Sequence, residues 1–420
     1  MRTTPEIADI LNHSRPHEPR AIPTPKYVLA NPNNNNFILT LGGQLNVIMG
    51  GDIGNNLYKQ SGAGISFVTS QIPVPSVRGK RGDFFICPID GYVDLQVVGF
   101  GNTKNEVTGY LKIGTNGVNT NLTLQRAYVT WRGLTAGLKL TLFQDDYACQ
   151  PPTIDPEGPS GCISAATYEV SYKSKSYNGF RFAAGLDVPS YNSSNGYYRG
   201  PDYYTGKDKE GKPIQVTNGE KVSATNYDQY IPDVPLWVEY SFSQWNRIRL
   251  SGIVRNFLYR DLVNDKSRDA LGWGVMLSGN IQPAKKWIIY YQFAYGEGIG
   301  AYLQDIAGHP YSFVPDAKAP GKMKASPMLG ANLGVSFNPT SKLQFNAMFS
   351  ESRIFDVRDY ANAQSESLNY KYALYGAVNC FYNINSFLQL GVEYLYGHRQ
   401  TWNIHGADDH RIQTQLSFTF

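Results

Sequence analysis

Eight basic side chains recur in segments where polar and apolar residues alternate, always on the polar side of that alternation. They are Lys112, Arg126, Lys139, Arg181, Arg249, Arg255, Arg399 and Arg411. Four acidic residues share that side: Asp145, Asp187, Glu239 and Glu393. An arginine guanidinium is planar, stays charged at physiological pH and binds a carboxylate through two parallel hydrogen bonds. Because the basic groups outnumber the acidic ones by eight to four, a surface that gathers them favours small anions.

A second group of charged residues lies in one proline-rich stretch, residues 146–161. Asp155 and Glu157 lie within it, and Asp145 directly precedes it. If this stretch folds against the basic residues, its carboxylates would create a transverse field between the two surfaces.

The four cysteines fall into two kinds. Cys149 lies in the proline-rich stretch and Cys162 directly follows it, and this close spacing favours a disulfide and an oxidising compartment. That bond would close a loop with twelve residues between the cysteines, worth about 3 kcal/mol in the chain-entropy model. Cys87 and Cys380 have apolar-side parity and are expected to be small apolar side chains.

Patterns for catalysis and metal binding are missing. The sequence has no G-x-S-x-G nucleophile motif and no H-E-x-x-H zinc motif. The net charge is only +4, without a run of lysine or arginine, which argues against nucleic acid. We therefore expect no enzymatic activity, no cofactor, no metal site and no nucleic-acid partner.

The charged residues lie in segments that predict β-strands. In residues 411–420, Ile412, Leu416 and Phe418 share one face, while Gln413 and Gln415 share the other. A period of two indicates a strand with one apolar and one polar side. Sixteen such segments begin near residues 37, 83, 106, 122, 138, 163, 180, 235, 247, 270, 287, 327, 342, 368, 387 and 410.

The connections between these segments alternate in length. Seven are tight, and the longest of the others span residues 50–82, 191–234 and 301–326. Short turns on one edge and long loops on the other are typical of an outer-membrane barrel. Charged residues make up 17% of the chain and mean hydropathy is −0.35, as expected when half of each strand is polar.

Aromatic residues provide a second test of the barrel. Six lie beside tight turns or at the terminus, with apolar-side parity: Trp131, Phe180, Phe242, Trp287, Phe337 and Phe420. In a closed barrel they form a girdle at one membrane interface. A β-propeller would show a blade repeat of about 40–50 residues, and the sequence has none. The prediction is an all-β, 16-stranded antiparallel transmembrane β-barrel, integral to the outer membrane of a Gram-negative bacterium.

The first 36 residues differ from the rest. Residues 5–12 predict a short amphipathic helix, and the proline- and asparagine-rich stretch after it predicts an extended linker. We expect two parts, a periplasmic N-terminal segment over 1–36 and a barrel over 37–420.

Laid out in this way, the chain resembles the DcaP-like family of trimeric porins. The segment that carries most weight is LFQDDYACQPPTIDPEGPSGCISAATYEVSY, residues 142–172. There a strand ends in Phe and Asp, an Asp-x-Glu-Gly-Pro stretch follows, and a Gly precedes the next strand. IPVPS at 72–76 and GHRQTWNIHGADDHRIQTQLSFTF at 397–420 are also similar to the family.

The resemblance implies a homotrimer in the lipid bilayer that takes up small organic anions such as dicarboxylates. With strand parity, it predicts a third loop folded into a water-filled lumen, long extracellular loops and short periplasmic turns. Arg126 and Lys139 are the best candidates for selectivity because their strands flank that loop. Two alternatives stay open: the lumen charges only solvate the wall and pair with each other, or the barrel binds a partner through its long loops without transport.

Overall fold

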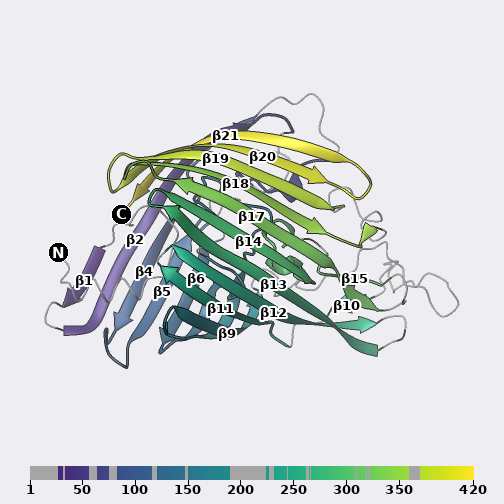
Figure 1. Ribbon diagram of the computed structural model, residues 1–420, viewed down its shortest axis with the longest axis horizontal. Coiled ribbons are helices and arrows are strands. Elements are labelled where there is room, and N and C mark those ends of the chain that lie inside the picture. The colour runs from purple at the N-terminus through teal and green to yellow at the C-terminus, as the bar shows by residue number, and fades with distance from the viewer. Residues whose placement is uncertain are drawn as a thin grey trace.

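The computed structural model describes most of the barrel. The described residues are 27–31, 34–55, 64–74, 83–115, 121–146, 150–189, 224–226, 231–243, 245–261, 264, 266–307, 309, 311–316, 319, 322–358 and 369–420. Within them, sixteen antiparallel strands form the closed wall of a barrel (Figure 1). None of these residues belongs to a helix that is long and apolar enough to cross a membrane.

The wall follows the order of the chain. Its strands are β2 (Asn34–Asp52), β3 and β4 (Asp83–Cys87 and Tyr92–Gly99, together one wall strand), β5 (Val107–Gly114), β6 (Thr123–Trp131), β7 (Leu134–Leu140), β8 (Ala166–Lys173), β9 (Phe180–Pro189), β11 (Val234–Ser243), β12 (Asn246–Asp261), β13 (Lys266–Ala284), β14 (Trp287–Glu297), β17 (Pro327–Phe337), β18 (Leu343–Ile354), β19 (Tyr372–Asn383), β20 (Leu388–Gln400) and β21 (Gly406–Thr419). The predicted fold class is therefore confirmed. Predicted starts differ from observed ones by at most four residues, as at β7, predicted from 138 and beginning at Leu134.

The barrel closes between its first and last strands. β2 pairs with β21 from Gln44↔Thr419 to Asp52↔Arg411, and with β4 on its other side. Phe420 N donates to Gly43 O at 3.0 Å. Gly43 fits this seam because a Cβ there would meet the Phe420 ring at 2.5 Å.

The two faces of the wall differ as the alternation predicts. On β21, Ile412 and Leu416 are exposed on the outside, while Arg411 and Gln413 are buried inside. Most of the predicted girdle residues are exposed on the outer face, and Trp287 stacks on Phe337 with ring centroids 4.4 Å apart. The outer face is thus an apolar surface of the kind that lipid requires.

The N-terminal segment contributes a strand that the sequence did not indicate. β1 (Tyr27–Asn31) pairs with the start of β2, in register from Tyr27↔Leu41 to Ala30↔Ile38. Part of the expected linker is therefore paired, and β2 begins at Asn34 rather than at residue 37. The predicted helix over 5–12 lies outside the described residues.

Three long connections fold into the barrel rather than away from it. They are the described parts of the loops after β2 (residues 64–74), after β7 (141–146 and 150–165) and after β14 (298–326). The first contains η1 (Thr69–Gln71), and the last contains η3 (Gly300–Tyr302), η4 (Gln304–Ile306), β15 (Phe313–Pro315) and β16 (Met323–Ala325). Their buried apolar side chains pack with lumen-facing residues of the wall, for example Tyr302 and Phe143 with Met276.

Candidate pore and its charged wall

The loop after β7 crosses the lumen to the far side of the barrel. Glu393, on the lumen face of β20, accepts hydrogen bonds from Ile154 N at 3.0 Å and Asp155 N at 2.8 Å. Gly161 N donates to Ser350 Oγ on β18 at 2.7 Å. This is the predicted third loop, and these contacts place it inside the barrel.

The other two inward loops cover much of the remaining wall. Arg399 donates to Ile72 O in the loop after β2 at 3.0 Å, and Arg411 donates to Ile65 O in the same loop. Arg255 donates to Gly298 O in the loop after β14 and stands over the Tyr302 ring. These three arginines are at most 2% exposed.

Within the described residues, partly exposed cations of the lumen face occur on β6, β7 and β9, and they mark its open part. On β13, β14 and β18, lumen-facing side chains such as Ser278, Gln292 and Ser350 are fully buried. On β6, β7 and β9, the lumen-facing Arg126, Lys139 and Arg181 are only partly buried. The described loops therefore cover these three side chains less than they cover the opposite side of the lumen.

Two ion pairs on this wall share one arrangement. Lys139 Nζ lies 2.8 Å from Glu169 Oε1, and Arg181 pairs with Glu239. The cations are 22% and 23% exposed, whereas both carboxylates are fully buried. The lumen surface therefore presents the positive member of each pair.

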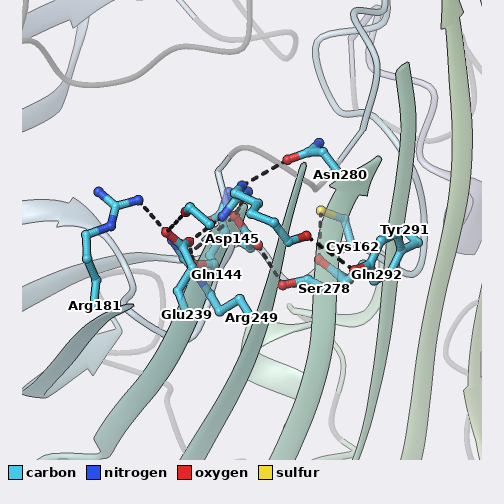
Figure 2. A network of polar contacts seen from close by, with 12 residues as sticks. Gln144, Asp145, Cys162, Arg181, Glu239, Arg249, Ser278, Asn280, Tyr291 and Gln292 are labelled. Atoms are coloured by element: carbon cyan, nitrogen blue, oxygen red, sulfur yellow. Dashed lines mark hydrogen bonds and ion pairs between the residues drawn. The ribbon is translucent and has the colours of Figure 1, made fainter. Parts of the chain in front are cut away.

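Behind Arg181, a buried network ties the wall to the start of the third loop (Figure 2). Glu239 accepts from Arg247 at 2.5 Å and from Arg249 at 2.7 Å, and Arg247 also pairs with Asp145 at 2.5 Å. Ser278 Oγ donates to Asp145 Oδ2 at 2.6 Å. Burial alone would raise the pKa of Asp145, but Arg249 and Arg247 outweigh it and lower this pKa.

Predicted site residues therefore divide into two groups. All eight basic residues lie on the lumen side of their strands, and Arg126, Lys139 and Arg181 border the open part. Lys112 is buried over the Tyr92 ring, Arg249 is held in the network just described, and loops cover the remaining three. Strand parity identified their side correctly, but it could not show which of them the loops would cover.

Two acidic residues of the third loop, Asp155 and Glu157, contact the other two inward loops, and Asp155 also contacts β19. Asp155 accepts from Phe67 N at 3.0 Å and from Tyr375 OH at 3.1 Å, next to Glu393. Glu157 accepts from Gln304 Nε2 at 2.8 Å. Arg411 of the basic wall acts on Asp155, and Asp145, at the start of the same loop, pairs with Arg247 and Arg249. The transverse field itself stays a prediction.

Among the described residues, Arg247 and Lys173 are examples of lumen-side cations that the sequence analysis missed. Arg247 carries the same parity as Arg249 two residues later, and Lys173 the same parity as Glu169. Lys173 Nζ lies 5.6 Å from the centre of the Trp237 ring. Its charged neighbours include Arg249, Arg181 and Lys139 as well as the acid Glu239, so it adds a further cation to this wall. Extending the parity count to the end of each strand would have identified both Arg247 and Lys173.

The cysteines were partly anticipated. Cys162 is buried and disulfide-bonded, while Cys149 lies outside the described residues, so that partner stays a prediction. Cys87 and Cys380 are free thiols. Cys380 follows the outward parity of β19, but Cys87 packs inside with Ile65 and Ile154, because the loops supply an apolar core within the lumen.

Comparison with known proteins gives structural matches alone. No protein-family model and no curated protein sequence matches the chain. The outer-membrane channel DcaP of Acinetobacter baumannii superposes with a TM-score of 0.68 at 16% identity, covering 92% of this chain and 98% of that one.

Two further structures share the architecture less closely. An anion-selective porin from Comamonas acidovorans matches with a TM-score of 0.52 at 9% identity, over 91% of this chain and 100% of that one. Outer-membrane OmpT of Vibrio cholerae matches with 0.51 at 10% identity, over 93% and 100%. The chain therefore has the fold of the outer-membrane channels of the DcaP type.

Proposed function

We propose that this protein is an outer-membrane porin through which small hydrophilic solutes diffuse passively, with a preference for anions. One observation carries the preference: Lys139 and Arg181 are open to the lumen, while the carboxylates that they pair with are fully buried. A passing solute meets the cations first, so the local potential is more positive than the formal charge count suggests.

The class of solute follows from the same wall. Arg181 offers a planar donor set suited to carboxylates, and Lys139 and Lys173 lie close enough to add charge. Small organic anions, dicarboxylates among them, are the class that we propose. The similarity to a DcaP channel supports the barrel, and the assembly that we propose is a homotrimer in the outer membrane.

Reconstitution into planar bilayers tests this function directly. Under an asymmetric KCl gradient we expect discrete open-channel current steps and a reversal potential that is shifted toward the equilibrium potential of chloride. Liposome swelling with a panel of dicarboxylates, monocarboxylates, sugars and amino acids then ranks the solutes. A protein that inserts but never conducts would support the alternative of a surface barrel that binds a partner through its loops.

A further inference from the structure

One residue joins all three inward loops. Asp305, in η4, accepts from Thr69 Oγ1 at 2.9 Å and from Ser70 N at 2.8 Å, both in the loop after β2. Its own N–H donates to Ser160 O in the third loop at 3.2 Å. The loops therefore form one body, here called the plug, which comprises the described residues 64–74, 150–165, 298–307, 309, 311–316, 319 and 322–326.

Glu157 holds the neighbouring contact between two of these loops. Gln304 Nε2 donates both to Glu157 O at 3.1 Å and to Glu157 Oε1 at 2.8 Å. Two residues earlier, Asp155 bonds to Phe67 N of the first loop. The plug thus contains three carboxylates, those of Asp155, Glu157 and Asp305, within electrostatic reach of one another.

The groups around Glu157 supply little positive charge. In the described part of the chain, none of these three carboxylates forms an ion pair. From the wall, Glu393 adds a further acid, and the Tyr375 and Tyr370 hydroxyls donate to Asp155 and Asp305.

The two nearest guanidiniums, Arg411 and Arg399, act on Asp155 and Asp305. Arg411 is already paired with Asp52, and Arg399 donates to backbone carbonyls. His309 lies beside Arg399.

We propose that Glu157 is a pH switch on the plug. Protonated, it stays docked on the loop after β14; ionised, it is repelled by Asp155 and Asp305 and releases the third loop. This inference goes beyond the proposed function and depends on it only where current is the readout.

The direction follows from the surroundings of Glu157. Burial, and then the charge of Asp155, raise its pKa from 4.5 to about 7 in the docked state. In a released, hydrated loop the ordinary value of 4.5 returns. The docked state is therefore most strongly favoured below pH 4.5. The ratio of docked to released loop falls roughly tenfold per pH unit between pH 4.5 and about pH 7, and it changes little at higher pH.

Amide hydrogen exchange followed by mass spectrometry tests the switch without any need for current. We expect peptides within 150–165 and 298–307, corrected for the chemical exchange rate, to exchange more than tenfold faster at about pH 7 than at about pH 5. Glu157→Gln stays neutral, so its exchange should be slow at both values. Glu106→Gln, at a short turn on the opposite edge, is the matched control and should behave as the wild type.

The outcomes separate the two proposals. Equal protection of the wild-type loops at both pH values would overturn the switch, as would a pH response that survives in Glu157→Gln. If the exchange responds to pH but no current flows in bilayers, the switch stands and the porin function fails. If current flows, its mean level should rise between about pH 5 and pH 7 in the wild type and stay level in Glu157→Gln.

Discussion

Arg181 and Glu239 face each other on neighbouring strands, and only the arginine is open to the lumen. They are register partners on β9 and β11, with the guanidinium 23% exposed and the carboxylate fully buried. Glu239 is covered because Arg247 and Arg249 bind its Oε2 atom, while Arg181 binds Oε1. The charge that a solute meets is therefore decided by which member of a pair is covered, more than by the sum of charges on the wall.

Removing the exposed cations should lower anion selectivity. In a water-like medium, one unit charge a few ångströms from the solute path is worth roughly 0.5–1 kcal/mol. Lys139→Gln and Arg181→Gln are each expected to lower the chloride-to-potassium permeability ratio by about two- to fivefold. The measurement is the reversal potential under an asymmetric KCl gradient. Arg132→Gln, at an exposed turn, is the control, and an equal effect there would argue against our lumen assignment.

Removing Glu239 should destabilise the barrel far more than removing an exposed acid. Glu239→Ala leaves Arg181, Arg247 and Arg249 without their shared anion, which costs about 3–5 kcal/mol when the charges are buried. The temperature at which the folded barrel loses its fast mobility in detergent electrophoresis should drop clearly. Asp356→Asn breaks the exposed Lys324 pair and should cost less than about 1 kcal/mol. Similar losses for both variants would contradict the buried network.

A methyl group at Gly161 should push the third loop off the wall. A Cβ there would meet Glu351 O at 2.1 Å and Ala331 N at 2.7 Å, both backbone atoms of wall strands. We expect Gly161→Ala to cost about 1–3 kcal/mol and to raise single-channel conductance, measured in planar bilayers. Gly109→Ala is the control because a Cβ at that position meets nothing within 4 Å. Unchanged conductance in Gly161→Ala would show that this contact does not set the width of the pore.

Proteolytic digestion with and without reductant tests the predicted Cys149–Cys162 disulfide. Digestion without reductant should give a Cys149–Cys162 cross-linked peptide that reduction separates. Cys162→Ser should lower the free energy of unfolding by about 3 kcal/mol in the chain-entropy model. Cys380→Ser, at a free thiol, should leave the free energy of unfolding nearly unchanged. Recovery of Cys149 as a free thiol would refute the pairing.

The number of wall strands, their approximate starts and the lumen parity of the eight basic residues were accessible from the sequence. Each depends on local alternation, as in Arg411–Gln413–Gln415, and local alternation survives in a closed barrel. Loop docking depends instead on contacts between distant segments, such as Ser70 with Asp305, and no local pattern reports them. The side of Arg399 was therefore predictable, but its covering by Ile72 was not. The same reasoning explains why Cys87 was expected to face lipid.

The contacts of Asp305 with the other two inward loops also constrain the order in which the parts of the protein can fold. Those with Ser70 and Thr69 join residues separated by 235 and 236 positions in the chain, and the third loop is held by Glu393 on the last but one strand. Contacts with such long sequence separation form late, because the entropy of closing the chain must be overcome first. The plug can therefore settle only after nearly the whole wall has formed, and folding should pass through a wide, unplugged barrel before the narrow one appears.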